Sequence, residues 1–185
     1  MEEPRRRRFD ADEFIAWGLE QPEGRYELSH GEVVRLGPDR VDHALVKGDV
    51  WVALRAAVRA RGLEGEALPN GMAVRVGADS VYDPDALLRC GARLPGDAAE
   101  IADPVVVVEV VSPVVRGIDA GAKLYGYFGL PSLRHYVMVL TGDRAVVHHR
   151  RGAAGVIETR FLREGTLELD PPGIEIEVAD MLASL

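Results

Sequence analysis

The most apolar stretch of the chain spans residues 105–111, where six valines surround a single carboxylate, Glu109. β-Branched residues that do not alternate with polar ones are typical of a central strand that helices cover on both faces. Pro104 and Pro113 bracket the stretch and limit its length. The pattern therefore predicts that residues 105–111 form the innermost strand of an α/β fold.

Three stretches carry the signals of helices. Between residues 42 and 62, apolar side chains recur at helical spacing and arginines occupy the other side. Residues 118–128 form a second long helix candidate, which the glycine and proline that follow would end. A shorter helix is predicted to begin after Asp10 and to run to about Leu19, because Asp10 can cap it and Glu13 can act as the reciprocal partner.

Short strand-like runs, separated by turn residues, occupy most of the remaining sequence. They cover residues 25–28, 32–36, 66–68, 72–76, 82–88, 136–140, 145–149, 156–161 and 173–178. We expect the last two runs to finish the sheet. Together the runs and the helices predict an α/β fold with a mixed central β-sheet flanked by helices, and with additional N-terminal and C-terminal hairpins.

Length and composition indicate one ordinary globular domain. With 185 residues and 47% hydrophobic content, the chain can bury one sizeable core but is short for two domains. We assign residues 1–24 to an N-terminal arm with the short helix, and residues 25–185 to the single domain. Cys90 is the only cysteine, which excludes an intrachain disulfide and favours a reducing, cytoplasmic setting. The apolar stretches are too short for export or membrane insertion, so we expect neither.

The net charge of -8 restricts the ways in which the chain could bind a nucleic acid. Neutralisation of phosphates supplies most non-specific affinity, so such a partner would need a local basic patch. The charge counts against a protein that coats DNA. It counts less against a nuclease, because metal ions offset the charges of the site carboxylates and of the substrate phosphate.

A carboxylate in the most apolar strand needs a physical reason. An unpaired buried charge costs several kcal/mol or shifts its pKa until it is neutral, so Glu109 should have a cation partner or lie at the mouth of the strand. Twenty-four residues earlier, Asp83-Pro84-Asp85 ends a pair of strands. A divalent metal shared between Asp85 and Glu109 would satisfy both carboxylates.

The next predicted helix continues the pattern of charges. Asp119, Lys123 and Tyr127 fall at successive i,i+4 positions and so share one helix face, which could close over the end of the strand. The chain has twenty arginines but only two lysines, Lys47 and Lys123. A lysine at position 123 is therefore unusual in a chain whose basic residues are nearly all arginines. Lysine has a compact ammonium, which can bind a water molecule or a phosphate near a metal.

With these residues in place, the chain resembles the Uma-two family, a family of restriction endonucleases in the PD-(D/E)xK superfamily. The matching segments are Pro84-Asp85, Val108-Glu109-Val110-Val111-Ser112-Pro113, Asp119, Lys123, Tyr127, Tyr26-Glu27-Leu28, Gly31-Glu32, His43, Leu130-Pro131-Ser132-Leu133 and His135-Tyr136. The resemblance runs from about Arg25 to the C-terminus. It implies a restriction-endonuclease-like core.

The resemblance also implies roles for individual residues. The superfamily normally has a lysine two residues after the glutamate on the same strand, but Val111 occupies that position here. The Uma-two pattern places the lysine on the following helix, at Lys123. It follows by resemblance that Asp85 and Glu109 would bind Mg²⁺ or Mn²⁺, that Lys123 would steady the attacking water and that Glu27 would be an auxiliary acid. The implied activity is metal-dependent hydrolysis of DNA phosphodiester bonds.

Each candidate also has an ordinary structural interpretation. Asp85 follows a proline, and its only role can be to stabilise a turn. Asp119 and Lys123 can form a surface ion pair worth about 0.3 to 0.5 kcal/mol. Glu27 can be a solvated carboxylate on an edge strand. His43 can help to begin the long helix or can contact a phosphate, and we favour the structural role.

Other polar features favour structural interpretations more strongly. His148 and His149 are adjacent in a predicted strand and must point to opposite faces, so they cannot form a compact pair of ligands. Arg5 to Arg8 can be an arm for nucleic acid, although charge runs are usually solubilising ends. Ser112 has no Gly-x-Ser-x-Gly elbow around it, and we expect it to bond the turn after the strand.

Two further interpretations compete with the metal-dependent nuclease. The chain could be a non-catalytic nucleic-acid-binding or regulatory module that keeps the nuclease fold, which the net charge and the displaced lysine both permit. It could also act as a subunit of a homodimer whose sheet edges pair.

Overall fold

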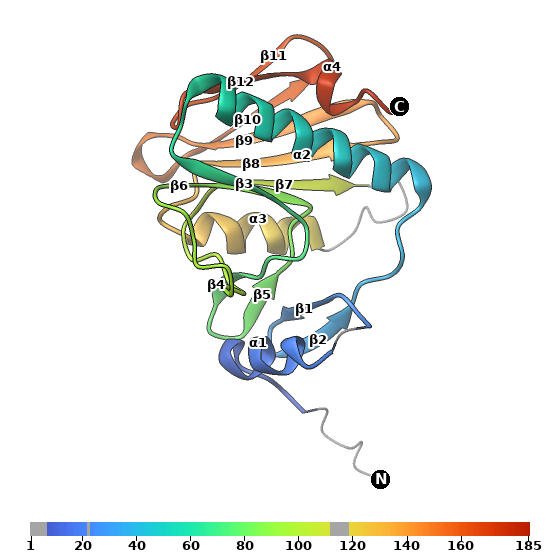
Figure 1. Ribbon diagram of the computed structural model, residues 1–185, viewed down its shortest axis with the longest axis vertical. Coiled ribbons are helices and arrows are strands. Elements are labelled where there is room, and N and C mark those ends of the chain that lie inside the picture. Colours follow the sequence, from blue (N-terminus) through green and yellow to red (C-terminus); the bar gives the residue numbers. More distant parts are fainter. Residues whose placement is uncertain (1–6, 22, 112–118) are drawn as a thin grey trace.

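The computed structural model describes residues 7–21, 23–111 and 119–185 (Figure 1). Its elements are α1 (Ala11–Leu19), β1 (Tyr26–Ser29), β2 (Glu32–Arg35), α2 (Val41–Arg61), β3 (Gly65–Pro69), β4 (Val74–Gly77), β5 (Ser80–Tyr82), β6 (Ala86–Cys90), β7 (Pro104–Val111), α3 (Asp119–Gly129), β8 (His135–Leu140), β9 (Ala145–Arg151), η2 (Ala153–Gly155), β10 (Ile157–Leu162), β11 (Thr166–Leu169), β12 (Ile174–Glu177) and α4 (Val178–Met181).

A mixed sheet forms the centre of the molecule, with its six strands in the order β10-β9-β8-β7-β6-β3. β7 and β8 are parallel, and the other neighbouring pairs in this sheet are antiparallel. Helix α3 lies between β7 and β8 in the sequence, as a parallel pair requires of its crossover connection. Helix α2 lies along one face of the sheet and α3 along the other (Figure 1). The predicted mixed sheet with flanking helices is confirmed.

Strand β7 is covered on both faces, as its run of valines predicts. Successive side chains of a strand point to opposite faces. Val106 and Val108 join the apolar core that α2 covers, whereas Val107 joins a second core with Tyr127 of α3. Glu109 has the same parity as Val107, so its side chain faces α3.

Helix α2 confirms the long helix predicted over residues 42–62. Its buried residues Val46, Val50, Leu54 and Val58 follow one another at intervals of four and form a single stripe against the sheet. The helix ends at Gly62, whose φ of 66° is a left-handed conformation that glycine adopts without strain. In the part of the chain that the structure describes, no helix is long and apolar enough to cross a membrane.

A smaller four-stranded sheet, in the order β2-β1-β5-β4, lies with α1 at the other end of the molecule (Figure 1). Helix α1 begins as predicted, because the Asp10 side chain accepts a hydrogen bond from the Glu13 backbone and the Glu13 side chain accepts one from the Asp10 backbone. Phe14 of α1 is buried with Leu28 of β1 and Val81 of β5. This packing fixes β1 against β5.

The prediction of one strand over residues 82–88 is wrong. Strand β5 ends at Tyr82 and β6 begins at Ala86, and the chain passes between them from the small sheet to the central sheet. The intervening Asp83-Pro84-Asp85 segment contains a proline, which lacks the N–H group that a ladder needs. The break therefore places Asp85 at the junction of the two sheets.

The prediction that residues 173–178 finish the central sheet is also wrong. Strand β12 pairs with β11 in a separate two-stranded sheet. Sequence analysis missed β11, in which exposed Thr166 and Glu168 alternate with buried Leu167 and Leu169. Four residues are too few for this alternation to stand out from a loop.

Two histidines meet inside the fold, where β8 pairs with β9. His135 Nδ1 lies 2.9 Å from His148 Nε2, and His135 Nε2 lies 2.8 Å from the carbonyl oxygen of Pro171. A carbonyl can only accept, so His135 carries its proton on Nε2 and accepts a hydrogen bond from His148 at Nδ1. Burial lowers the pKa of both histidines to about 4. Both rings are therefore neutral at neutral pH.

The histidine pair should make the fold less stable in acid. The unfolded pKa of histidine is about 6.5, above the folded values. The stabilisation is thus complete above about pH 6.5 and is lost as the pH falls toward 4, because the unfolded chain binds the protons more readily. We expect the melting temperature of His148→Gln to rise relative to that of the wild type as the pH is lowered from about 7 to about 5. Glutamine can keep the donor to His135 without titrating, so the variant lacks the acid-sensitive contribution of His148.

His30→Asn is the matched control for this measurement. His30 is exposed, and asparagine tolerates its positive φ of 50°. The control should follow the wild type at each pH. If His148→Gln lost as much stability in acid as the wild type does, the buried pair would not be the cause.

Candidate active site

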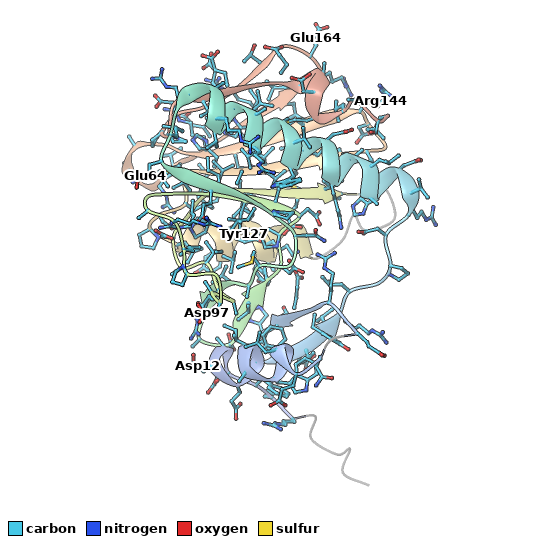
Figure 2. The ribbon with its side chains drawn as sticks, in the orientation of Figure 1. Asp12, Glu64, Asp97, Tyr127, Arg144 and Glu164 are labelled. Carbon is cyan, nitrogen blue, oxygen red and sulfur yellow. The ribbon has the colours of Figure 1, made fainter. Side chains whose placement is uncertain are left out.

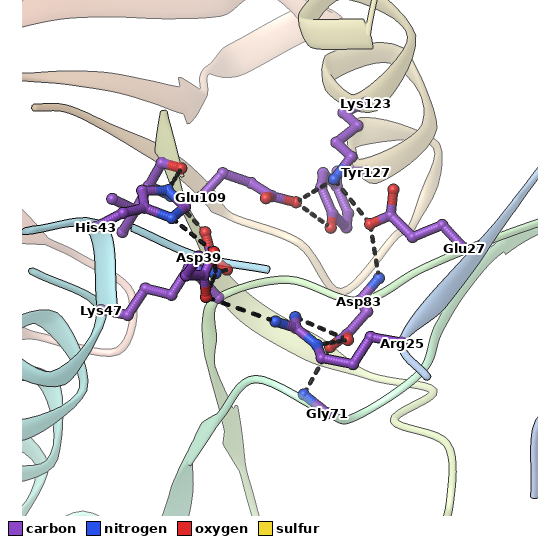
Figure 3. A network of polar contacts seen from close by, with 12 residues as sticks. Arg25, Glu27, Asp39, His43, Lys47, Gly71, Asp83, Glu109, Lys123 and Tyr127 are labelled. Atoms are coloured by element: carbon purple, nitrogen blue, oxygen red, sulfur yellow. Dashed lines mark hydrogen bonds and ion pairs between the residues drawn. The ribbon is translucent and has the colours of Figure 1, made fainter. Parts of the chain in front are cut away.

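A cavity of about 660 Å³ opens at the C-terminal end of β7. Glu27, Asp85, Glu109 and Lys123, the four residues that the sequence nominates, all line it. They come from β1, the segment before β6, β7 and α3, respectively. Figure 3 shows the carboxylates of Glu27 and Glu109 turned toward the Lys123 ammonium. The fold therefore gathers all four predicted residues at one site.

Lys123 links two of the carboxylates. Its Nζ donates hydrogen bonds to Glu27 Oε1 at 2.8 Å and to Glu109 Oε1 at 3.0 Å. Tyr127, one helical turn further along α3, donates its hydroxyl to the same oxygen of Glu109 at 2.8 Å. Glu27 Oε1 also accepts the backbone N–H of Asp83 at 3.0 Å. Glu27 thereby joins the small sheet to the site.

Burial dominates the electrostatics of Glu109. It raises the pKa of this carboxyl to about 8, against the attraction of Lys123 and with the added repulsion of Asp85 and Glu27. Burial also raises the pKa of Tyr127, so its hydroxyl remains protonated and acts as a donor. With a pKa of about 8, the Glu109 carboxyl loses its proton just above neutral pH. An additional cation nearby would favour its ionised form.

Asp85 is held by contacts on both of its oxygens. Oδ2 accepts the backbone N–H of Val110 at 2.7 Å, and Oδ1 lies 2.8 Å from Lys47 Nζ. Lys47 comes from α2 and also bonds Asp39, at 2.7 and 2.9 Å. Lys47 is not among the site residues predicted from the sequence. The scarcity of lysine that singled out Lys123 applies equally to Lys47, so that signal could have found it.

His43 connects α2 to the end of β7. Its Nε2 lies 2.6 Å from the carbonyl oxygen of Val110, and its Nδ1 lies 2.8 Å from Asp39 Oδ1. Burial disfavours the charge on Asp39, but hydrogen bonds from Lys47 and His43 outweigh it and lower its pKa. His43 has a structural bond, as favoured from the sequence, and it also lines the cavity.

The ordinary interpretations of two site residues do not agree with the structure. Glu27 is 5% exposed, and β1 lies between β2 and β5, so it is not a solvated carboxylate on an edge strand. Asp85 binds the backbone of β7 rather than only its own turn. The side chain of Asp119, on which its proposed ion pair depends, lies outside the part of the chain that the structure describes. Ser112, with its proposed turn bond, and most of the Arg5 to Arg8 run also lie outside it.

The donor chemistry of the site fits a hard divalent cation. Asp85 and Glu109 supply carboxylate oxygens, and the two side chains among the described residues that donate to Glu109 contact Oε1 rather than Oε2. Within the described ranges, no group of three or more histidine, cysteine, aspartate or glutamate residues could hold a metal. Mg²⁺ often keeps several waters and binds through one or two carboxylates and substrate phosphates. Two carboxylate ligands from the protein are therefore enough for a site of this type.

A mixed sheet with acidic residues and a lysine at the end of its central strand places the chain among restriction-endonuclease-like folds. A solved structure, described as a putative nuclease belonging to DUF820 from Anabaena variabilis, superposes with a TM-score of 0.71. The match covers 95% of this chain and 98% of that chain at 16% sequence identity. The likeness confirms the predicted fold.

The family follows from the sequence. A model of the Uma2 family, described as a putative restriction endonuclease, matches residues 11–182. The chain therefore belongs to the Uma2 family, and the predicted resemblance is confirmed. The uncharacterized protein slr1290 of Synechocystis is 22% identical to it over 169 residues, which cover 90% of this chain and 87% of that protein.

Glu109 should make the fold less stable as the pH rises. The pKa of its carboxyl is raised from 4.5 to about 8 in the folded protein. Its stabilising contribution is therefore complete below about pH 4.5 and is lost as the pH rises through about 8, because the folded state holds the proton more tightly. Glu109→Gln cannot ionise. We expect its melting temperature to rise relative to that of the wild type at the same pH as the pH is raised from about 5 to about 8, because the buried histidines contribute equally to both proteins.

Glu164→Gln is the control for this substitution. Glu164 is exposed and lies at the periphery, far from Tyr127 and the site (Figure 2). Its melting temperature should follow the wild type across the same range. A wild-type pH dependence in Glu109→Gln would show that Glu109 is not the group responsible.

Proposed function

We propose that the chain is a Mg²⁺- or Mn²⁺-dependent endonuclease that hydrolyses phosphodiester bonds of DNA, with Asp85 and Glu109 as the metal ligands. The observation that carries this proposal is the convergence of these two carboxylates and Lys123 in one cavity. The Uma2 family and the nuclease name of the structural relative support the same reaction class.

The residues of the site have distinct roles in this proposal. A divalent cation, when bound, would supply a Lewis acid for the phosphate and lower the pKa of a water. Lys123 offers an ammonium beside Glu109, where it can orient the attacking water or accept charge that develops on the phosphate. Glu27 holds that ammonium in place and can act as the auxiliary acid. Tyr127 fixes the orientation of Glu109.

Lys47 is a further residue that we assign to this function. It supplies the positive charge beside Asp85 in the structure. A divalent cation at Asp85 would compete with this ammonium, because like charges repel at short range. Displaced from Asp85, Lys47 could turn to a phosphate oxygen, which offers the same kind of contact. Removal of this ammonium should therefore favour metal binding and impair the reaction.

The wall of the cavity carries cationic side chains that could contact a phosphate. Arg25, Arg40, Lys47 and Lys123 line it, together with the carboxylates of Glu27, Asp39, Asp42, Asp83, Asp85 and Glu109. A single divalent metal ion would add two positive charges and so offset the excess of two carboxylates. With the carboxylates offset in this way, the four cations could contact a backbone phosphate, which is what a nucleic-acid substrate requires.

One observation favours a non-catalytic binding or regulatory module as the second candidate. The carboxylates are already paired with ammoniums: Lys123 lies between Glu27 and Glu109, and Lys47 between Asp39 and Asp85. A site whose charges are balanced in this way can persist without a metal. Such a module would bind DNA without cleaving it.

Metal binding can be measured apart from activity. A ligand that binds only the folded state raises its stability, by about 2.7 kcal/mol at a concentration one hundred times the Kd. We expect Mn²⁺ to raise the melting temperature of the wild type, and Asp85→Asn and Glu109→Gln to abolish the increase. Lys47→Met should bind Mn²⁺ more tightly than the wild type, because the competing ammonium is absent.

Glu64→Gln, in an exposed turn after α2, is a matched carboxylate control and should respond as the wild type does. If Mn²⁺ stabilised Asp85→Asn and Glu109→Gln as much as the wild type, neither residue would be a ligand.

Cleavage assays separate the nuclease from the module through Lys123. With single- and double-stranded DNA and either metal, Lys123→Ala should lower cleavage by about 10²-fold or more, because charge stabilisation in the transition state is lost. Lys123→Arg should recover little, since a planar guanidinium cannot occupy the place of an ammonium. Glu27→Gln should lower cleavage while the chain remains folded.

Arg93→Ala is the control, because the Arg93 side chain is 92% exposed. It should cleave at the wild-type rate. Equal cleavage by the wild type and by all the site variants would assign the activity to a contaminant or to another site. DNA binding without cleavage by the wild type would favour the module.

A further inference from the structure

Strand β10 leaves one long edge of the central sheet open. Within the described ranges β10 pairs only with β9, and five of its six residues are exposed. Phe161 is 75% exposed and Ile157 is 38% exposed. The pairing with β9 is regular over all six residues, and the strand contains no proline. Two of the usual devices that block an open edge, a bulge and a proline, are thus missing from this strand.

The register with β9 determines which backbone groups of β10 face the open side. The N–H of Gly152 bonds the carbonyl of Val156 at 2.8 Å, and the N–H of Arg151 bonds Arg134 on the opposite side of β9. Hydrogen-bonded pairs alternate along an antiparallel ladder. Residues 158, 160 and 162 therefore bond β9, and residues 157, 159 and 161 direct their N–H and C=O groups outward.

The sequence of β10 is complementary to itself in one antiparallel register. When Thr159 lies opposite Thr159 of a second copy, Glu158 of each copy lies opposite Arg160 of the other. In the same register, Ile157 of each copy lies opposite Phe161 of the other. Opposite charges and apolar pairs at directly opposed positions stabilise a sheet. The outward N–H and C=O groups of residues 157, 159 and 161 then form the hydrogen-bonded pairs.

The neighbouring symmetric registers are unfavourable. A two-fold axis at Glu158 would place two glutamates opposite each other, and an axis at Arg160 would oppose two arginines. Like charges in directly opposed positions destabilise a strand pair. The charges thus select the register centred on Thr159 from its nearest alternatives.

We propose that the chain forms a two-fold symmetric homodimer through β10, centred on Thr159, in which the central sheet continues from one copy into the other. The pairing gives every outward backbone group of β10 a partner and covers Ile157 and Phe161. Strands β8 and β9 separate β10 from β7, which carries Glu109. The dimer therefore does not use the residues of the candidate active site, and it is independent of the proposed function.

The test is the oligomeric state of the purified chain, measured by light scattering and sedimentation over about a hundredfold range of concentration. We expect the wild type to be a dimer. Arg160→Glu should weaken the dimer by about tenfold or more, because two like-charge pairs replace two ion pairs. The double variant Glu158→Arg with Arg160→Glu restores opposite charges in the same register, and it should recover the wild-type dimer.

Two other variants separate the edge from general effects of charge and folding. Thr159→Pro removes the outward N–H at the two-fold axis without removing a backbone hydrogen bond to β9, although it also removes the side-chain hydrogen bond between Thr159 Oγ1 and His149 Nδ1. It should give a monomer whose circular dichroism matches that of the wild type. Arg163→Glu makes the same charge change just beyond the strand and should remain dimeric. A wild type that is monomeric throughout, or a dimer that Arg160→Glu leaves intact, would overturn the proposal. A double variant no more dimeric than Arg160→Glu would overturn the register.

Discussion

The burial of a carboxylate in the central strand is the constraint on which the rest of the site depends. Glu109 is the one charged residue in a run, residues 105–111, that is otherwise made of valines, and burial disfavours its charged form. Such a group must be protonated or paired with a cation. Lys123 and Tyr127 meet it from α3, and the ammonium of Lys123 in turn needs Glu27. One buried charge therefore ties the central sheet, its crossover helix and the small sheet together.

This arrangement is poorly explained by stability alone. Buried ion pairs often contribute no more than apolar side chains of the same volume would, because desolvation offsets their attraction. The chain nevertheless places both of its lysines and three aspartates or glutamates that are nearly inaccessible, Glu27, Asp85 and Glu109, around one cavity. The proposed metal-dependent chemistry would require such a concentration of charges in one place.

The sequence predicts the parts of this structure that depend on long, regular patterns. The valine run of β7, the four-residue spacing of α2 and the cap at Asp10 each act locally, and each prediction is confirmed. Strand β11 was missed because four residues carry too little periodicity, and the partner of β12 was wrong because pairing is a long-range property. Glu109 and Lys123 stand out by their residue types, a carboxylate in an apolar strand and one of two lysines. Asp85 was paired with Glu109, and the role of Glu27 came from the family resemblance. The ties of Lys47 to Asp39 and Asp85 depend on how α2 crosses the sheet, which no local pattern encodes.

The position of the lysine illustrates how a fold can preserve a site while its sequence pattern changes. Residues 109 and 111 lie two apart on one strand, so a lysine at position 111 would project from the same face as Glu109. Val111 occupies that position, and α3 covers this face. Lys123 projects from α3 toward the strand and brings its ammonium to 3.0 Å from Glu109. The ammonium of Lys123 thus approaches Glu109 from the helix, whereas a lysine at position 111 would approach it from the strand. The proposed chemistry requires an ammonium beside the carboxylate, and the topology of β7 and α3 allows either element to provide it.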